Sequence, residues 1–439
     1  MCIFLPCFRC TGERVEEKVN LIVDGKILIS GLTKNTARSG IYFASFNIFK
    51  ELLKSDKVNI ILYVEGKNYL LLKEFLTQEF PKNKIKIISD IEGNNCISLW
   101  YLYLSAIKKR AKVAKQSIRK FLCILALLIL KPLVKIFSKP LDIKRYGNNL
   151  CFLSLCFAVP EIFKNCRNYT ILYDITPLVF PDYFPSDKVG FWFASLMDSL
   201  NAKAGYFAIS EATKKDFLKV APVLNEKQIT TTLLACDDSF LPVDKALVEK
   251  VRAKYKIPEG KRYVFSLCSL EPRKNLLRAV KTFVQFLKKN DIDDLVFVLG
   301  GGQWDTFIAK LDAEIKNQED YKDKIVKIGY VDDEDLAALY SGAEWFVYTS
   351  QYEGFGMPPL EAMSCGCPVI SSNSSSLPEV VGDAGIMVDY DSDEQHIAAY
   401  EKYYFSEDLR KENAAKGLER AKNFSWEKTG KIILDKISA

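Results

Sequence analysis

The chain has 439 residues, a length that predicts two or three domains rather than one core. Hydrophobic residues make up 49% and charged residues 26%, as in an average globular protein, which argues against extended disorder. The net charge of +6 is modest and its basic excess is local, so the composition gives little support to nucleic-acid binding. The first ten residues lack a basic region followed by a long apolar run, so we expect no secretory signal and reduced cysteines.

Short apolar runs alternate with helical patterns, which is typical of βαβ units and parallel sheets. In the first half we predict a strand over 26–30, a loop with Gly and Ser over 31–40 and a helix over 41–53. Further strands of this half are predicted at 58–63, 85–89, 150–157, 169–174 and 205–210.

The stretch over 108–139 does not follow this alternation of apolar runs and helical patterns. It carries ten lysines and arginines around an unbroken apolar run over 121–130, and no Asp or Glu occurs from residue 93 to residue 141. The apolar run is too short to span a bilayer, which needs about 20 residues. One interpretation is a core helix with a solvated basic collar. We favour the other, a helix at the membrane surface that binds anionic lipid, because acidic residues are absent.

A second series of strands and helices begins after residue 238, and we place the boundary near Pro242. Its strands are predicted at 263–268, 295–300, 325–329, 345–349 and 368–371, separated by helices such as 275–289 and 334–341. Ligands of open parallel sheets bind at the carboxyl ends of the strands. We therefore expect the functional site in a cleft between the two halves.

Two glutamates, Glu353 and Glu361, are separated by seven residues in Tyr352-Glu-Gly-Phe-Gly-Met-Pro-Pro-Leu-Glu361. Glu353 follows a predicted strand in a Gly-rich turn. Glu361 is expected in the first turn of a helix that begins near Pro359, where proline is tolerated and acids are favoured. A helix that the glutamates only cap is the competing interpretation, and it does not account for the whole segment.

The composition of this segment suits a sugar nucleotide. Gly354 and Gly356 allow the backbone to come close to a ligand. Loop amides and a helix N-terminus can face an anionic diphosphate. Carboxylates are good acceptors for the paired hydroxyls of a sugar or ribose.

The segment resembles glycosyltransferase family 4, whose hallmark is a pair of glutamates separated by seven residues. The resemblance covers most of the chain and is densest over 263–389. Further matching segments are Ser269-Leu-Glu-Pro-Arg-Lys-Asn275, Leu299-Gly-Gly-Gly302, Leu339-Tyr-Ser-Gly-Ala343, Ser376-Leu-Pro-Glu-Val380 and Phe424-Ser-Trp-Glu427. The resemblance implies an α/β protein of the GT-B fold, in which two Rossmann-like domains face each other across a cleft. The acceptor domain would span 1–240 and the donor domain 241–422, with a last helix over 423–439 crossing back.

The resemblance also implies roles for residues of the donor domain. Arg273 and Lys274 are expected to neutralise the donor diphosphate and to stabilise it as a leaving group. Glu353 is expected to contact the transferred sugar, and Glu361 the ribose hydroxyls. Backbone contacts to the donor are expected from Gly354, Phe355 and Gly356, and contacts to the base from Gly329 to Val331.

In the first half, Leu172-Tyr-Asp-Ile-Thr-Pro-Leu-Val-Phe-Pro181 resembles the family's His-Asp-x-x-Pro segment. Tyr173 replaces the histidine that usually lies near the reacting sugar. Asp174 is expected at a strand end facing the cleft, where it binds the acceptor hydroxyl or accepts its proton. Capping the following turn is the equally weighted alternative for Asp174.

Five other residues have a definite expectation. Gly40 matches the Gly-rich loop that approaches the donor phosphates, and Ser210 is expected to cap a helix. The only histidine, His396, lies outside every motif and is expected at the surface. Cys7 and Cys10 form a CxxC pair, but zinc needs four ligands, so we expect no metal site there.

The resemblance implies a retaining enzyme that moves a hexose, with mannose as the candidate, from a nucleotide diphosphate sugar to a glycan or lipid-linked saccharide of a surface polysaccharide such as lipopolysaccharide or capsule. No cofactor or metal is implied, since cationic side chains and helix dipoles take the metal's electrostatic role. The expected location is cytoplasmic, peripheral on the inner face of the cytoplasmic membrane, with no nucleic-acid partner.

Two alternatives stay open. A catalytically impaired homologue could act as a partner subunit, and Tyr173 is the feature that supports this. A nicotinamide-dependent oxidoreductase is disfavoured because Gly31 and Gly40 lack the G-x-G-x-x-G spacing.

Overall fold

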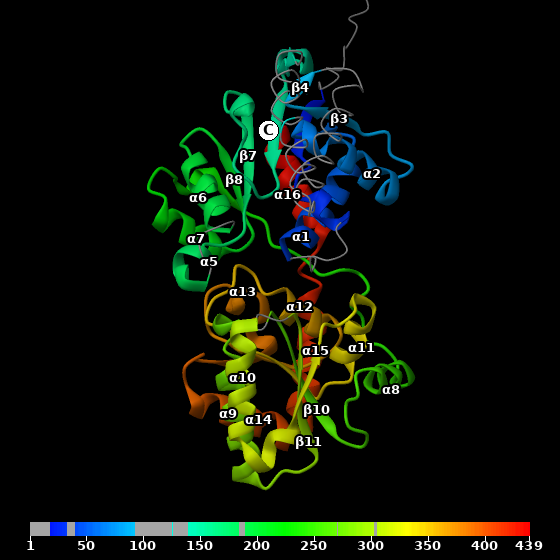
Figure 1. The fold of residues 1–439 in the computed structure, drawn as a ribbon, viewed down its shortest axis with the longest axis vertical. Helices are drawn as coiled ribbons and strands as arrows, with labels where there is room; N and C mark the ends of the chain where they lie inside the picture. The colour runs from blue at the N-terminus through cyan, green and yellow to red at the C-terminus, as the bar shows by residue number, and fades with distance from the viewer. Residues whose placement is uncertain are drawn as a thin grey trace, which may run out of the picture.

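The computed structural model describes residues 18–32, 40–92, 125, 139–183, 189–269, 271–302 and 305–439. These residues form two lobes, one above the other in Figure 1. The CxxC pair and, apart from Leu125 and Lys139, the basic and apolar stretch over 108–139 lie outside the described residues. Within the described ranges, no helix is both long enough and apolar enough to cross a bilayer.

The first lobe contains a seven-stranded sheet in the order β3-β2-β1-β6-β7-β8-β9, with every neighbouring pair parallel. Its strands are β1 (Val19–Asp24), β2 (Val58–Val64), β3 (Lys86–Ser89), β6 (Leu150–Ser154), β7 (Arg167–Leu172), β8 (Gly205–Ala208) and β9 (Ile229–Thr231). The central strands are apolar along their length because helices cover both faces of a parallel sheet. The helices are α1 (Gly40–Leu53), α2 (Tyr69–Glu79), α5 (Thr176–Val179), α6 (Val189–Ser199) and α7 (Glu211–Val220). A short antiparallel pair, β4 (Ile91–Glu92) and β5 (Lys139–Pro140), lies beside this sheet.

The second lobe contains a six-stranded parallel sheet in the order β12-β11-β10-β13-β14-β15. Its strands are β10 (Arg262–Leu267), β11 (Leu295–Gly300), β12 (Ile325–Gly329), β13 (Trp345–Tyr348), β14 (Val369–Ser372) and β15 (Gly385–Val388). Its helices are α8 (Lys245–Lys254), α9 (Leu276–Asn290), α10 (Asp305–Asn317), α11 (Leu336–Ser341), α12 (Met357–Ser364), α13 (Leu377–Val381), α14 (Asp393–Phe405) and α15 (Glu407–Ala421). The strand order reverses between β10 and β13, which is where doubly wound sheets bind ligands.

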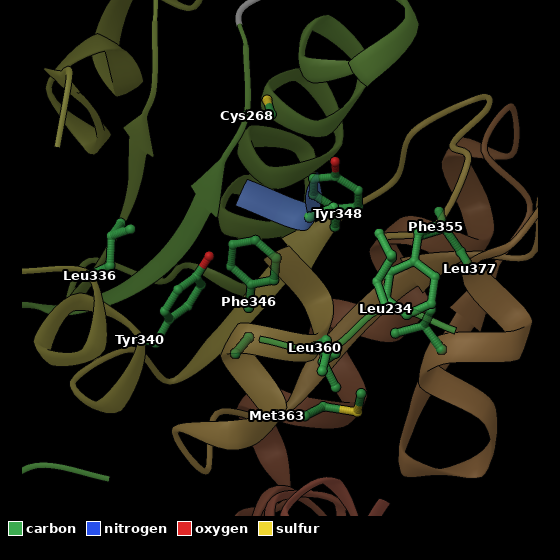
Figure 2. Close-up of a cluster of buried hydrophobic side chains, with 14 of the residues drawn as sticks. Leu234, Cys268, Leu336, Tyr340, Phe346, Tyr348, Phe355, Leu360, Met363 and Leu377 are labelled. Atoms are coloured by element: carbon green, nitrogen blue, oxygen red, sulfur yellow. The ribbon is translucent and has the colours of Figure 1, made fainter. Parts of the chain in front are cut away.

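The core of the second lobe positions the strand ends that carry the site. Figure 2 shows part of it, with Tyr340, Phe346 and Tyr348 beside Leu360 and Met363 of α12. The rings of Tyr340 and Phe346 meet edge to face with centroids 5.2 Å apart. Because α12 rests on this cluster, the segment that contains both glutamates is anchored to the sheet.

The last helix, α16 (Trp426–Ser438), leaves the second lobe and lies against α1 of the first (Figure 1). Gly430 permits this approach, since a Cβ there would lie 2.6 Å from Cβ of Glu51. Asp435 pairs with Lys57 at 2.9 Å. The described sheets and this helix follow the expected organisation, while the domain limits at residues 240 and 422 stay predictions.

The first strand was predicted at the wrong place. Residues Leu28–Leu32 form a 3-10 helix, and β1 is Val19–Asp24. Both runs are short and apolar, and pattern alone does not separate them. Only β1 can pair on both sides, with Val58–Tyr63 and with Leu150–Leu153, which places it in the middle of the sheet.

Candidate functional site

A cavity of about 670 Å³ lies between the lobes at the carboxyl ends of both sheets. Of the eleven residues predicted for the site, the nine that line it are Gly40, Asp174, Arg273, Lys274, Glu353, Gly354, Phe355, Gly356 and Glu361. Gly329 and Val331 are not among the lining residues. Gly329 ends β12, where its carbonyl accepts from the amide of Gly301 at 2.7 Å, and the side chain of Val331 is buried in the core. Their predicted contact with the base of the donor therefore stays a prediction, since neither residue lines this cavity.

The loop between β10 and α9 carries the two cations. A 3-10 turn over Pro272–Lys274 is followed by Asn275 in the left-handed region at φ 62°. The carbonyl of Arg273 accepts from the amide of Gln351 at 2.8 Å. This backbone bond fastens the cationic loop to the segment that contains Glu353.

The carboxylate of Glu353 is the centre of the site's electrostatics. Its Oε1 lies 2.5 Å from Nζ of Lys274 and its Oε2 lies 3.0 Å from Nη1 of Arg273. Glu353 is only 8% exposed, and burial raises the pKa of its carboxyl. The attraction of Lys274 and Arg273 outweighs this, so the pKa of Glu353 falls to about 2. Glu353 is therefore ionised at any physiological pH.

Arg273 and Lys274 keep donors free beyond these ion pairs. A lysine ammonium has three N–H donors, and Lys274 uses one on Glu353 and one on the Tyr348 hydroxyl at 2.9 Å. Arg273 also bonds the carbonyl of Tyr352 at 2.7 Å and pairs with Glu271 at 2.9 Å. Its Nε is buried without a partner among the described residues. Burial lowers the pKa of Arg273. The carboxylates of Glu353 and Glu271 raise that pKa by more than burial lowers it, so the guanidinium stays charged.

Gly354 brings the glutamate segment against the first lobe. A Cβ at this position would lie 2.6 Å from the carbonyl oxygen of Tyr173 and 2.9 Å from Cβ of Asp174, so a side chain does not fit. The carbonyl of Gly354 accepts from the hydroxyls of Ser210 at 2.7 Å and Thr213 at 3.1 Å. Asp174 is therefore held next to the segment that carries Glu353.

Glu361 lies in the second turn of α12, not in the first as predicted, because the helix begins earlier, at Met357. Gly356, at φ 116°, precedes it in a conformation that only glycine adopts readily. Of the first three helical residues only Met357 has an amide N–H, since prolines occupy 358 and 359. This helix therefore offers an anion fewer donors than an ordinary N-terminus.

The carboxylate of Glu361 accepts from the hydroxyl of Tyr340 at 2.9 Å. Burial raises the pKa of Glu361 to about 7, and the bond from Tyr340 offsets only part of that shift. The two glutamates thus differ in chemistry. Glu353 is a permanently charged group between two cations, while Glu361 changes its charge near neutral pH.

Tyr173 and Asp174 directly follow β7 at the wall of the cavity. The Tyr173 hydroxyl is 3.0 Å from Oγ of Ser45 in α1, and the ring is buried. Asp174 accepts from the amide of Thr176 at 2.9 Å. Asp174 therefore caps the following turn and also faces the cavity, so the two interpretations of this residue are compatible.

The sequence did not reveal the contacts that join the lobes. The hydroxyl of Tyr352 donates to Asp216 at 2.6 Å. Glu379 accepts from the amides of Glu211 at 2.8 Å and Ala212 at 2.6 Å, at the start of α7. No local pattern pairs residues more than 130 positions apart. The predicted cap is confirmed, since Ser210 accepts from the amide of Thr213 at 3.0 Å.

One prediction about a titratable residue is wrong. His396 is fully buried rather than at the surface, because its face of α14 packs on the core. Burial lowers its pKa to about 4, so the imidazole is neutral. Within the ranges that the structure describes, no three His, Cys, Asp or Glu side chains group as metal ligands.

Comparisons with known proteins agree on the family. A family model described as "Glycosyl transferases group 1" matches residues 248–420. O-antigen chain mannosyltransferase B of Escherichia coli is 36% identical over 262 residues, 60% of this chain and 67% of that protein. The serotype-specific mannosyltransferase WbdA of the same species is 27% identical over 292 residues, 64% of this chain, and the match spans only 34% of WbdA.

The fold has close counterparts among solved structures. A glycosyltransferase from Rickettsia africae superposes with a TM-score of 0.62 at 18% sequence identity, covering 96% of this chain and 98% of that one. This similarity, together with the two parallel sheets, confirms the predicted α/β class and the GT-B arrangement. The family model and the 36% identity to O-antigen chain mannosyltransferase B show that the chain belongs to the glycosyl transferases group 1.

Proposed function

We propose that the protein is a retaining hexosyltransferase that uses a nucleotide diphosphate sugar to extend a glycan or lipid-linked saccharide of a bacterial surface polysaccharide. Mannose is the sugar we favour, since the relatives named above are mannosyltransferases. One observation carries the proposal. Arg273, Lys274, Glu353 and Glu361 line a single cavity at the strand ends of both lobes.

The donor end of the cavity suits a diphosphate bonded to a sugar. Lys274 has one N–H donor left after its bonds to Tyr348 and Glu353, and this donor is available to a phosphate oxygen, where charge develops as the leaving group departs. The charged guanidinium of Arg273 stabilises the same phosphates electrostatically. Glu353 lies between the same two cations, so it can accept from a sugar hydroxyl beside the phosphates. Glu361, on the next helix, is the proposed partner of the ribose hydroxyls.

The proposed reaction exchanges one bond at C1 of the sugar for another. The bond from C1 to the diphosphate oxygen breaks, and the acceptor oxygen bonds to C1 from the same face through an oxocarbenium-like transition state. The acceptor's proton passes to the departing phosphate oxygen. Asp174, held beside Gly354 across the boundary between the lobes, is proposed to orient the acceptor hydroxyl.

Two further parts of the proposal concern the surroundings of the reaction. Catalysis is proposed to need no metal, and turnover should survive EDTA. The stretch over 108–139 is proposed to dock the protein on the cytoplasmic membrane face, where it would meet a lipid-linked acceptor. Co-sedimentation with anionic vesicles should weaken with added salt and on replacing Lys108, Lys109, Arg110 and Lys112 by Gln.

A donor screen tests the proposed function directly. The full chain is incubated with a panel of nucleotide sugars, and loss of donor and formation of nucleotide diphosphate are followed by mass spectrometry. A nucleoside diphosphate mannose is expected to be consumed, with slow hydrolysis when acceptor is omitted. A chain that consumes no nucleotide sugar, with or without mannose-containing acceptors, would support the non-catalytic alternative instead.

A further inference from the structure

A second cavity of about 360 Å³ lies wholly in the first lobe. Its walls are the ends of β1 and β2 with the residues just after them, the segment after β6, and α6. The lining residues are Asp24, Lys26, Tyr63, Glu65, Phe157, Ala158, Val159, Pro160, Phe191, Trp192 and Ser195. None of them has a part in the donor chemistry described above.

Buried polar groups face this cavity. Asp24 is only 4% exposed, and one of its carboxylate oxygens accepts from the amide of Lys26 at 2.9 Å. Tyr63 is 5% exposed, and burial raises the pKa of its hydroxyl well above the usual value, with a further contribution from the nearby carboxylates of Asp90, Asp24 and Glu65. Burial raises the pKa of Asp24 to about 6, so the carboxylate is ionised at neutral pH. A carboxylate or hydroxyl oxygen that lines an open cavity can accept further hydrogen bonds from the hydroxyls of a ligand or of water.

Aromatic rings form the remaining walls. Phe157 and Trp192 meet edge to face with centroids 6.1 Å apart, and Nζ of Lys26 lies 4.4 Å from the centre of the Phe157 ring. Phe191 is 76% exposed at the rim. Flat apolar faces beside a few convergent polar groups are the usual lining of a small-molecule site.

The two cavities are neighbours. Trp192 lines both of them, and the adjacent residues Cys156 and Phe157 line one each. Asp24 ends β1, while Asp174 follows β7, and β6 is the single strand between β1 and β7. Neighbouring strands are about 4.8 Å apart, so β1 and β7 are separated by about 10 Å. A short oligosaccharide can bridge that separation.

We propose that this second cavity is an acceptor subsite that binds a neutral hexose unit of the acceptor glycan while the reacting hydroxyl lies in the large cavity. The inference rests on the proposed function, because it says where a further unit of that reaction's acceptor glycan binds. The carboxylates of Asp24 and Glu65 accept from sugar hydroxyls, and the rings of Phe191 and Trp192 cover the apolar faces of the sugar. The same two carboxylates repel uronic acids and phosphorylated sugars, so the subsite selects for neutral units.

Direct binding tests the subsite without any turnover. The full chain is titrated with α-linked mannobiose, with methyl α-mannoside and with a disaccharide of the same size that contains glucuronic acid, and saturation-transfer NMR reports binding. Mannobiose should bind at least tenfold more tightly than the acidic disaccharide at neutral pH. Phe191→Ala should weaken mannobiose about tenfold, and Tyr63→Phe, which removes one hydroxyl, about three- to tenfold.

Phe405→Ala is the matched control, since Phe405 is 66% exposed on α14 of the other lobe and lines neither cavity. It should leave mannobiose binding unchanged. In the transfer assay, Phe191→Ala should raise the KM of a disaccharide acceptor and leave the donor KM unaltered. The subsite is disproved if no saccharide binds, if the acidic disaccharide binds as tightly as mannobiose, or if folded Phe191→Ala and Tyr63→Phe bind like the unmodified chain. Because binding needs no donor, these outcomes are independent of a negative donor screen.

Discussion

Oε1 of Glu353 lies 2.5 Å from Nζ of Lys274, and both side chains are buried where the two lobes meet. The pair joins the loop after β10 to the segment after β13, two strands that are neighbours in the sheet. A predicted sugar ligand and a predicted phosphate ligand are thus partners of each other. Changing either residue removes a close partner of the other in a buried place, which shapes the predictions that follow.

Removing Lys274 alone should destabilise the fold. Lys274→Ala leaves a buried carboxylate with one cation in place of two, and breaking a buried pair typically costs about 3–5 kcal/mol. The residual pairing with Arg273 should keep the loss at or below the low end of that range. The double variant Lys274→Ala/Glu353→Gln should recover part of the lost stability in urea unfolding. If the double variant is less stable than Lys274→Ala, the pair is not the source of the loss.

The two glutamates should separate catalysis from nucleotide binding. Glu353→Gln should remove most turnover and leave the affinity for nucleotide diphosphate nearly intact, because its proposed partners are sugar hydroxyls. Glu361→Gln should weaken the nucleotide, because its proposed partner is the ribose. Calorimetric titration with the nucleotide, beside initial rates, measures both effects. Equal and mild effects of both substitutions would contradict the division of roles.

Stability should depend on pH through Glu361. The carboxyl titrates near 4.5 in the unfolded chain and near 7 in the fold, because burial favours its neutral form. Between these values the folded protein holds a proton that the unfolded chain has lost, so stability should fall as pH rises from 4.5 to 7. Thermal unfolding across this range should show the fall in the unmodified chain and a shallower slope in Glu361→Gln. Identical slopes would show that other groups set the pH dependence.

Asp174→Asn should slow transfer to the acceptor more than it slows hydrolysis of the donor by water. The residue faces the cavity from the first lobe, whereas the proposed donor ligands belong to the second. Its bond from the amide of Thr176 can persist in the amide variant, so the fold should hold. The ratio of transfer to hydrolysis, measured with one donor, reports the effect. An unchanged ratio would leave Asp174 with its capping role alone.

Sequence patterns located most elements because buried parallel strands read as apolar runs. The strands β11 and β12 coincide with their predicted ranges, 295–300 and 325–329. The first strand was misplaced by seven residues at its start, since two apolar runs compete and pairing decides between them. The sequence predicts the start of α12 near the proline at 359, whereas the helix begins at Met357, because Gly356 already turns the chain into the helix.

The sequence by itself determined the α/β class and the segments that carry Arg273, Lys274, Glu353 and Glu361, because these are local patterns of a few adjacent residues. Only the tertiary structure decided how the segments meet. In the structure, Glu353 pairs with both Arg273 and Lys274. The Tyr173 hydroxyl lies at hydrogen-bond distance from Ser45, and the Tyr352 hydroxyl donates to Asp216. Such contacts join positions far apart in the chain, and their geometry follows from strand order and from the packing of the two lobes. No run of neighbouring residues encodes that geometry.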